Sequence, residues 1–184
     1  MSYADYIIVL EAIVTGFVIS YLLAKWGQLL NDEKNYYWIP VVWSISLMLH
    51  LLFRWWFDFH YRLGELYEQT GFGYLLYFMA RPFLIYLSAI ILFKEKECNN
   101  YQCFAPQIRL TFIVLAFMWG FDVIDWAFIR NKSIFGGAHR IQPLTNLVFA
   151  LILAIKPSKI ILILATIVAI AFQLILFYYA LFIW

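Results

Sequence analysis

The sequence predicts an all-α, polytopic integral membrane protein, a helical bundle with about six transmembrane helices. Of its 184 residues, 65% are hydrophobic and only 13% are charged, which is about half the charge of a typical soluble domain. The hydrophobic residues form continuous runs that approach or exceed the length of about 18 residues that marks a membrane span. Such runs, without strict alternation of polar and apolar residues, are typical of membrane helices.

We expect these spans to form one transmembrane domain that covers residues 1–184. The expected spans are residues 6–30, 38–59, 72–93, 108–129, 141–155 and 160–184. The longest expected loop, residues 94–107, is too short to fold as a separate domain.

The first two spans carry interface signals at their ends. Lys25 and Trp26 lie near the end of the first span, and residues of these types commonly anchor helices at the membrane surface. Pro40 falls in the first turn of the second span, where the missing N–H of proline matters least.

The third and fourth spans hold polar groups within apolar runs. Pro82 lies near the middle of the third span, where the loss of a backbone hydrogen bond predicts a kink. In the fourth span, Asp122 and Asp125 are about one helical turn apart, so both carboxylates share one face of the helix.

The fifth span, residues 141–155, is short enough to be re-entrant rather than membrane-crossing. Pro157 follows it in a tight turn. The sixth span carries only Thr166 and Gln173 as polar interior residues, and its continuous apolar run predicts a full crossing.

The distribution of basic residues indicates an orientation. If all six segments cross, one side holds Lys25, Lys34, Lys94, Lys96, Arg109, Lys156 and Lys159. The other side holds Arg62, Arg130, Lys132 and Arg140. Since cytoplasmic loops are enriched in Lys and Arg, we expect the first side in the cytoplasm and both termini outside it.

Cys98 and Cys103 are the only cysteines, separated by four residues in the third loop. If this loop is cytoplasmic, both thiols should be reduced, and we favour this interpretation. A small structural disulfide is the first alternative, and redox or metal chemistry is the second.

No motif of an enzyme, a cofactor site or a metal site is evident, so we expect a protein that is not an enzyme. His50 and His60 would lie about 15 Å apart along one helix, too far to ligate one metal ion. There is no nucleophile motif, phosphate-binding loop or zinc protease motif. The net charge of +2 does not favour direct binding of nucleic acid.

Ionisable residues inside the expected spans are the candidate functional residues. They are Glu11, His50, Arg54, Asp58, Arg81, Asp122 and Asp125. Unpaired charges are costly in hydrocarbon, so these residues either form a buried ion-pair network or line a water-filled pathway. We expect Arg81 to lie in the interior and to contact Asp122 or Asp125.

The second span carries three of these residues, His50, Arg54 and Asp58, at intervals of four. On a helix they form a polar stripe about 12 Å long. Such a stripe is expected to face other helices or water and not lipid.

Two classes of function remain. The first is a small oligomeric membrane protein that forms an ion-conducting or membrane-permeabilising pathway lined by the intramembrane charges. The second is a membrane-embedded scaffold or sensor subunit that docks a separate soluble effector, for example in a bacterial defence or toxin module. Either would be a multi-pass protein, with a bacterial inner membrane as the expected location. The expected partners are the lipid bilayer, further copies of the chain and, in the second class, a soluble protein.

Overall fold

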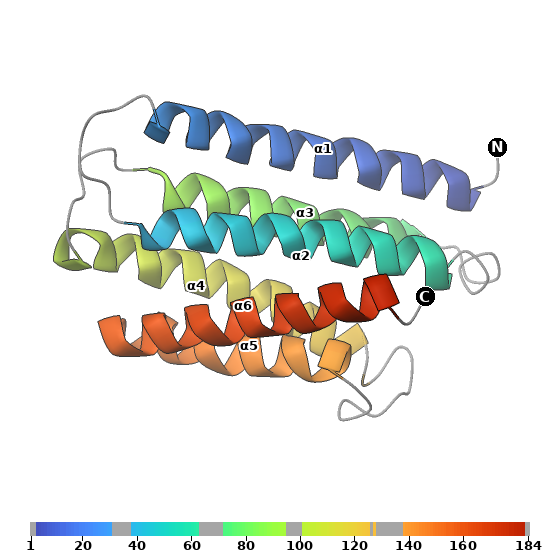
Figure 1. Cartoon of the computed structure of the whole chain (residues 1–184). Helices are drawn as coiled ribbons and strands as arrows, with labels where there is room; N and C mark the ends of the chain where they lie inside the picture. The colour runs from blue at the N-terminus through green and yellow to red at the C-terminus, as the bar shows by residue number, and fades with distance from the viewer. Residues whose placement is uncertain are drawn as a thin grey trace.

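The computed structural model describes residues 3–30, 38–62, 72–94, 101–125, 127 and 138–182. This part of the chain folds into six helices that run back and forth in one layered bundle (Figure 1). The helices are α1 (Tyr3–Leu30), α2 (Ile39–Arg62), α3 (Phe72–Leu92), α4 (Tyr101–Ile124), α5 (Ala138–Ile155) and α6 (Lys159–Phe182).

Five of the helices form a closed ring. α2 packs against α3, α3 against α4, α4 against α5, α5 against α6, and α6 returns to α2. α1 lies outside this ring against α2 and α3. The ring therefore has an interior of its own, and the side chains that fill it come from helices far apart in the sequence.

Three of the helices contain segments long and apolar enough to cross a membrane: residues 9–29, 101–124 and 159–178. The apolar segments 39–53, 79–92 and 141–155 are shorter. Large hydrophobic side chains are also exposed around the bundle, with Phe17 on α1 and Phe117 on α4 among them. The described residues thus agree with a membrane protein that is all-helical.

Helix bounds differ from the sequence prediction most clearly at α4. Residues 101–107 were expected to belong to a loop, but α4 begins at Tyr101 and includes Pro106. Pro106 is the sixth residue of α4, beyond the first turn, so it removes the backbone hydrogen bond that an N–H there would make to the Gln102 carbonyl, yet the helix continues through it. The fifth helix is also longer than expected, because α5 begins at Ala138 and has 18 residues.

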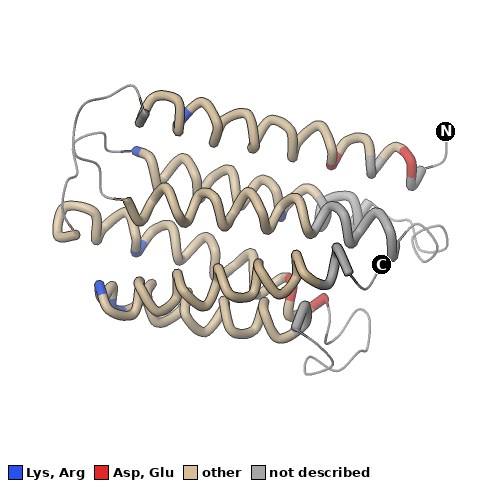
Figure 2. Tube along the Cα trace, viewed as in Figure 1, with Lys and Arg blue, Asp and Glu red and all other residues tan. Residues whose placement is uncertain are grey.

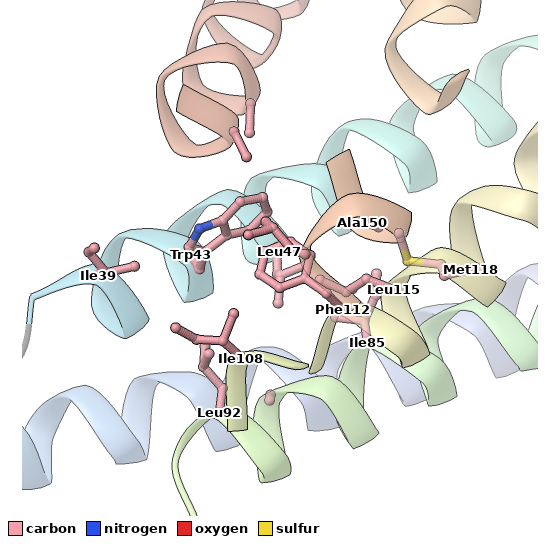
Figure 3. Packing of buried hydrophobic residues seen from close by; sticks show 14 of the residues in the cluster. Ile39, Trp43, Leu47, Ile85, Leu92, Ile108, Phe112, Leu115, Met118 and Ala150 are labelled. Atoms are coloured by element: carbon pink, nitrogen blue, oxygen red, sulfur yellow. The ribbon is translucent and has the colours of Figure 1, made fainter. Parts of the chain in front are cut away.

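Buried aromatic and aliphatic residues fill the ring interior (Figure 3). Trp43 of α2 contacts Phe112 of α4 edge-on, with ring centroids 4.9 Å apart. It also lies 6.4 Å from the ring of Trp119. Aromatic pairs of this kind contribute about 0.5–1.5 kcal/mol beyond their buried area. Large side chains thus join α2 to α4 across the ring.

Apart from Arg81 near mid-length of α3, the described charged residues lie toward the two ends of the bundle (Figure 2). At the end where α5 joins α6, the described charged residues are basic, whereas the described acidic residues lie toward the other end. The basic residues are Lys25, Lys94, Arg109, Lys156 and Lys159. The acidic residues are Asp5, Glu11, Asp122 and Asp125.

Candidate functional site

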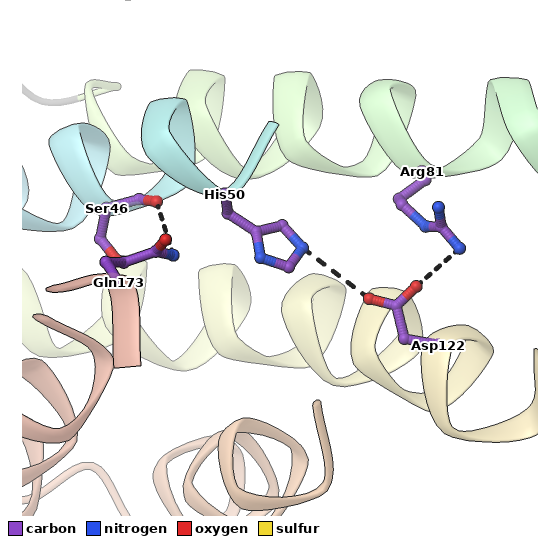
Figure 4. Close-up of polar contacts among 5 residues, drawn as sticks. All are labelled: Ser46, His50, Arg81, Asp122 and Gln173. Carbon is purple, nitrogen blue, oxygen red and sulfur yellow. Dashed lines mark hydrogen bonds and ion pairs between the residues drawn. The ribbon is translucent and has the colours of Figure 1, made fainter. Parts of the chain in front are cut away.

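Three ionisable side chains from three helices meet inside the ring (Figure 4). Arg81 Nη2 of α3 lies 2.7 Å from Asp122 Oδ1 of α4. His50 Nε2 of α2 lies 3.8 Å from the other carboxylate oxygen, Oδ2. The side chains of Arg81 and Asp122 are 3% and 0% exposed, and that of His50 is 9% exposed. We refer to these residues as the buried charge cluster.

The cluster lies near the middle of α2 and α3. His50 is eleven residues after Ile39, where α2 begins, and Arg81 is eleven residues before Leu92, where α3 ends. Both helix boundaries are at the same end of the bundle. At 1.5 Å per residue, His50 and Arg81 are each about 16 Å from that end, close to half the thickness of a bilayer core of about 30 Å.

Asp122 is the shared partner in the cluster. Burial of a carboxylate is costly unless it is paired, and the guanidinium of Arg81 supplies the opposite charge at hydrogen-bonding distance. With His50 neutral, the cluster has no net charge, and protonation of His50 would make it positive. One proton therefore changes the charge at the centre of the ring.

Further polar residues of α4 lie on the same side of the helix as Asp122. At 100° per residue, Gln107, Thr111, Asp122 and Asp125 fall within about 60° of one another around the helix axis. All four are buried. They cover about 27 Å of helix length, which is most of the thickness of a bilayer core.

An apolar section interrupts this polar face of α4. Between Thr111 and Asp122, a distance of about 16 Å along the helix, the inward residues include Leu115 and Met118, both fully buried. Trp43 and Trp119 lie in the same region, and their indole N–H groups have no hydrogen-bond partner among the described residues. The interior is thus closed by apolar and aromatic side chains at this level.

A second interhelical polar contact lies one helical turn from His50. The Gln173 side chain of α6 donates from Nε2 to the Ser46 carbonyl oxygen of α2 at 3.5 Å. The bond is buried, and its donor comes from the last helix of the ring. It holds α6 against α2 close to the buried charge cluster.

The expected contact between Arg81 and an acidic residue is confirmed, with Asp122 as the partner. His50 belongs to the same cluster through Asp122. The side chains of Arg54 and Asp58 lie outside the described residues, so the stripe on the second span stays a prediction. Glu11 on α1 and Asp125 on α4 are also buried.

Several polar residues of the ring interior were not singled out as site residues from the sequence. They are Ser46, Gln107, Thr111, Gln142, Asn146 and Gln173. For Gln107 and Thr111, the helical period counted back from Asp122 is a signal that could have found them.

Cys103 at the start of α4 is disulfide-bonded, so the favoured prediction of a reduced thiol is wrong at this position. That prediction rested on the inferred compartment and not on the spacing of the two cysteines. Cys98 lies outside the described residues. Among the residues that the structure describes, no group of three His, Cys, Asp or Glu side chains could hold a metal ion.

Comparison of the chain with protein-family models, curated proteins and solved structures finds no match.

Proposed function

We propose that all six helices cross a bilayer and that the five-helix ring surrounds an ion-conducting pathway, closed in this conformation and controlled by the buried charge cluster. The three long apolar segments support membrane insertion. The shorter apolar helices are compatible with crossing, because even α5, with 18 residues, is about 27 Å long.

The observation that carries the proposal is the position of the cluster. His50 and Arg81 lie near mid-length of α2 and α3, and inside the ring they meet Asp122, which lies two residues before the end of α4. Hydrophobic side chains of similar volume often stabilise a core as well as a buried ion pair does, so stability alone gives little reason for these charges. Ionisable residues at such a depth commonly belong to ion or proton pathways.

The polar face of α4 supplies a route from both ends toward the apolar section. Gln107 and Thr111 lie on one side of this section, and Asp122 and Asp125 lie on the other. Hydrophobic constrictions gate channels by excluding water. Leu115 would act as such a constriction until the helices move apart.

The sequence hypothesis placed the pathway within a homo-oligomer. Enclosure of the cluster inside one chain favours a pathway in each protomer. We keep the homo-oligomer in the proposal, with α1 as the contact helix, because α1 lies outside the ring. Gly16 and Ser20 on its exposed face would let the backbones of two helices approach closely.

Five described basic residues lie at one bundle end, and under the positive-inside rule they support a cytoplasmic location for that end. The disulfide at Cys103 points the other way, because disulfides persist in oxidising compartments. Maleimide labelling of Ser158→Cys, in the turn between α5 and α6, decides between them. We expect labelling only after the membrane is permeabilised.

The second candidate is a membrane scaffold or sensor subunit that docks a soluble effector. Burial and pairing of the cluster inside one chain favour it, because a charge network that is paired within one chain needs no water-filled pathway. Co-purification of a stoichiometric soluble partner, together with no ion flux from correctly inserted protein, would support this candidate.

The decisive test is ion flux into liposomes that contain the purified protein. We expect flux from the wild-type chain and altered ion selectivity from Asp122→Asn, which removes the negative charge of the cluster. Asp5→Asn is the matched control, because it neutralises a carboxylate on α1 outside the ring. Equal flux and selectivity in both variants would contradict the proposed pathway.

A further inference from the structure

Three cationic side chains lie close together where α5 turns into α6. Arg109 of α4 donates from Nε to the carbonyl oxygen of Ala154 at 3.0 Å, which fixes the guanidinium beside the last turn of α5. Lys156 follows two residues later, and Lys159 begins α6 after a two-residue turn. All three cationic residues therefore lie near one short segment of the chain, the turn between α5 and α6.

No carboxylate among the described residues lies at this end of the bundle. The sequence contains no Asp or Glu after Asp125, so the α5–α6 hairpin has no side-chain carboxylate of its own. The described acidic residues of the other helices lie toward the opposite end of the bundle. Arg109, Lys156 and Lys159 are all exposed. Among the residues that the structure describes, no carboxylate lies at this end of the bundle, which suits a partner of the opposite sign.

Exposed aliphatic side chains stand directly beside the two lysines. Ile155 precedes Lys156 and is 78% exposed, and Ile160 follows Lys159 and is 72% exposed. These are the highest exposures among the large hydrophobic residues described. Cations next to exposed aliphatic side chains match a lipid, whose charged headgroup and hydrocarbon chains lie side by side at the membrane surface.

We propose that Arg109, Lys156 and Lys159 bind the headgroup phosphate of an anionic phospholipid, with its acyl chains against Ile155 and Ile160. The Nε of Arg109 is committed to Ala154, which leaves both Nη groups to donate to phosphate oxygens. The inference requires α4, α5 and α6 to lie in a bilayer, as in the proposed function. It does not require the chain to conduct ions.

Native mass spectrometry of the full-length chain in detergent tests the site by titration with phosphatidylglycerol or with phosphatidylcholine of the same acyl chains. We expect tighter binding of phosphatidylglycerol. A basic residue near an anionic lipid surface contributes enough for about a fivefold change in affinity. The double variant Lys156→Gln/Lys159→Gln should therefore bind phosphatidylglycerol about 30-fold more weakly. Arg109→Gln should also weaken it.

The matched control is Lys25→Gln/Lys94→Gln, which removes two cations from the same end of the bundle but from α1 and the end of α3. We expect little change in lipid binding. An equal loss in both double variants would mean that only the overall positive potential matters and would overturn the site. Equal binding of the two lipids would also overturn it.

Inorganic phosphate is added as a competitor to identify the source of the phosphate. Weak competition by inorganic phosphate supports the lipid, because free phosphate lacks the contact with Ile155 and Ile160. Full displacement of phosphatidylglycerol by a low concentration of phosphate would overturn the lipid assignment. Liposome flux is measured on the same variants. Lipid selectivity without flux contradicts only the conducting pathway, whereas flux without lipid selectivity contradicts only this site.

Discussion

Asp122 Oδ1 forms an ion pair with Arg81 Nη2 at 2.7 Å, and the other carboxylate oxygen, Oδ2, lies 3.8 Å from His50 Nε2. The carboxylate thus joins α2, α3 and α4, of which α3 and α4 pack directly against each other. A side chain shared in this way couples the packing of the ring to the protonation of one histidine. We expect both the stability of the bundle and the proposed conduction to depend on this carboxylate.

Removal of Arg81 alone should destabilise the bundle strongly. Arg81→Met leaves the buried Asp122 carboxylate without its guanidinium, and loss of one partner of a buried pair costs roughly 3–5 kcal/mol. Thermal unfolding in detergent measures the effect. The double variant Arg81→Met/Asp122→Leu removes both charges and should recover most of the lost stability.

Lys25→Gln is the control, since it removes a cation from the partly exposed end of α1. Its effect should stay within about 0.5 kcal/mol. If Arg81→Met were no more harmful than Lys25→Gln, the ion pair would not be a stabilising contact.

The pairing of Arg81 could be predicted from the sequence, because an arginine in mid-span needs a carboxylate partner and the expected spans contain few carboxylates. The link from His50 to Asp122 could not. Helical periodicity fixes which residues share a face of one helix, but it does not say which helices are neighbours. The closed ring that brings α2 opposite α4 depends on packing of all five helices. The start of α4 was missed for a local reason, since Pro106 and its polar neighbours are typical of a loop.

Truncation of a side chain inside the ring should create a cavity. Leu153 of α5 is fully buried, and Leu→Ala at such a site costs about 2–5 kcal/mol. Leu151, two residues earlier on the same helix, is 48% exposed, so Leu151→Ala is the matched control and should cost less. Thermal unfolding in detergent measures the loss of stability in each of the two variants. Equal losses would mean that the inner face of α5 is assigned incorrectly.

The contact of α1 with α2 includes a hydrogen bond that can be removed selectively. Trp26 Nε1 donates to Ser44 Oγ at 2.7 Å, and Ser44 Oγ in turn donates to the Val41 carbonyl oxygen at 2.7 Å. Ser44→Ala leaves the indole N–H without its acceptor, at a cost of about 1–3 kcal/mol. Thermal unfolding in detergent measures the loss.

Ser20→Ala makes the same chemical change on the exposed face of α1 and serves as the control. We expect its stability to match the wild type in detergent. A larger loss from Ser20→Ala than from Ser44→Ala would contradict the hydrogen-bond assignment.

Self-association through α1 predicts that a bulky residue at Gly16 weakens the oligomer without unfolding the chain. A Cβ built at Gly16 has no atom within 4 Å, so Gly16→Leu fits the isolated protomer. Native mass spectrometry in mild detergent should show a symmetric dimer to tetramer for the wild type and mainly monomer for Gly16→Leu.

Gly120→Leu on α4 is the control, because a Cβ built at Gly120 also has no atom within 4 Å, and it should leave the oligomer intact. A wild-type chain present only as a 21.8 kDa species would rule out the proposed oligomer under these conditions.

Protonation of His50 should control the proposed pathway. Histidine ordinarily changes charge between about pH 5 and 8. The charged groups that face its imidazole from the described parts of neighbouring helices are Asp122 on α4 and, beyond it, Arg81 on α3. At low pH the cluster gains a positive charge, which raises the barrier to cations and lowers it for anions. Cation flux into liposomes should therefore decrease as the pH falls through this range, and His50→Gln, which cannot take up a proton, should flatten the profile.

Gln28→Ala, at an exposed position of α1, controls for effects outside the ring and should keep the wild-type profile. If the profile of His50→Gln followed that of the wild type, another group would be the proton acceptor and His50 would serve only to hold α2 against Asp122.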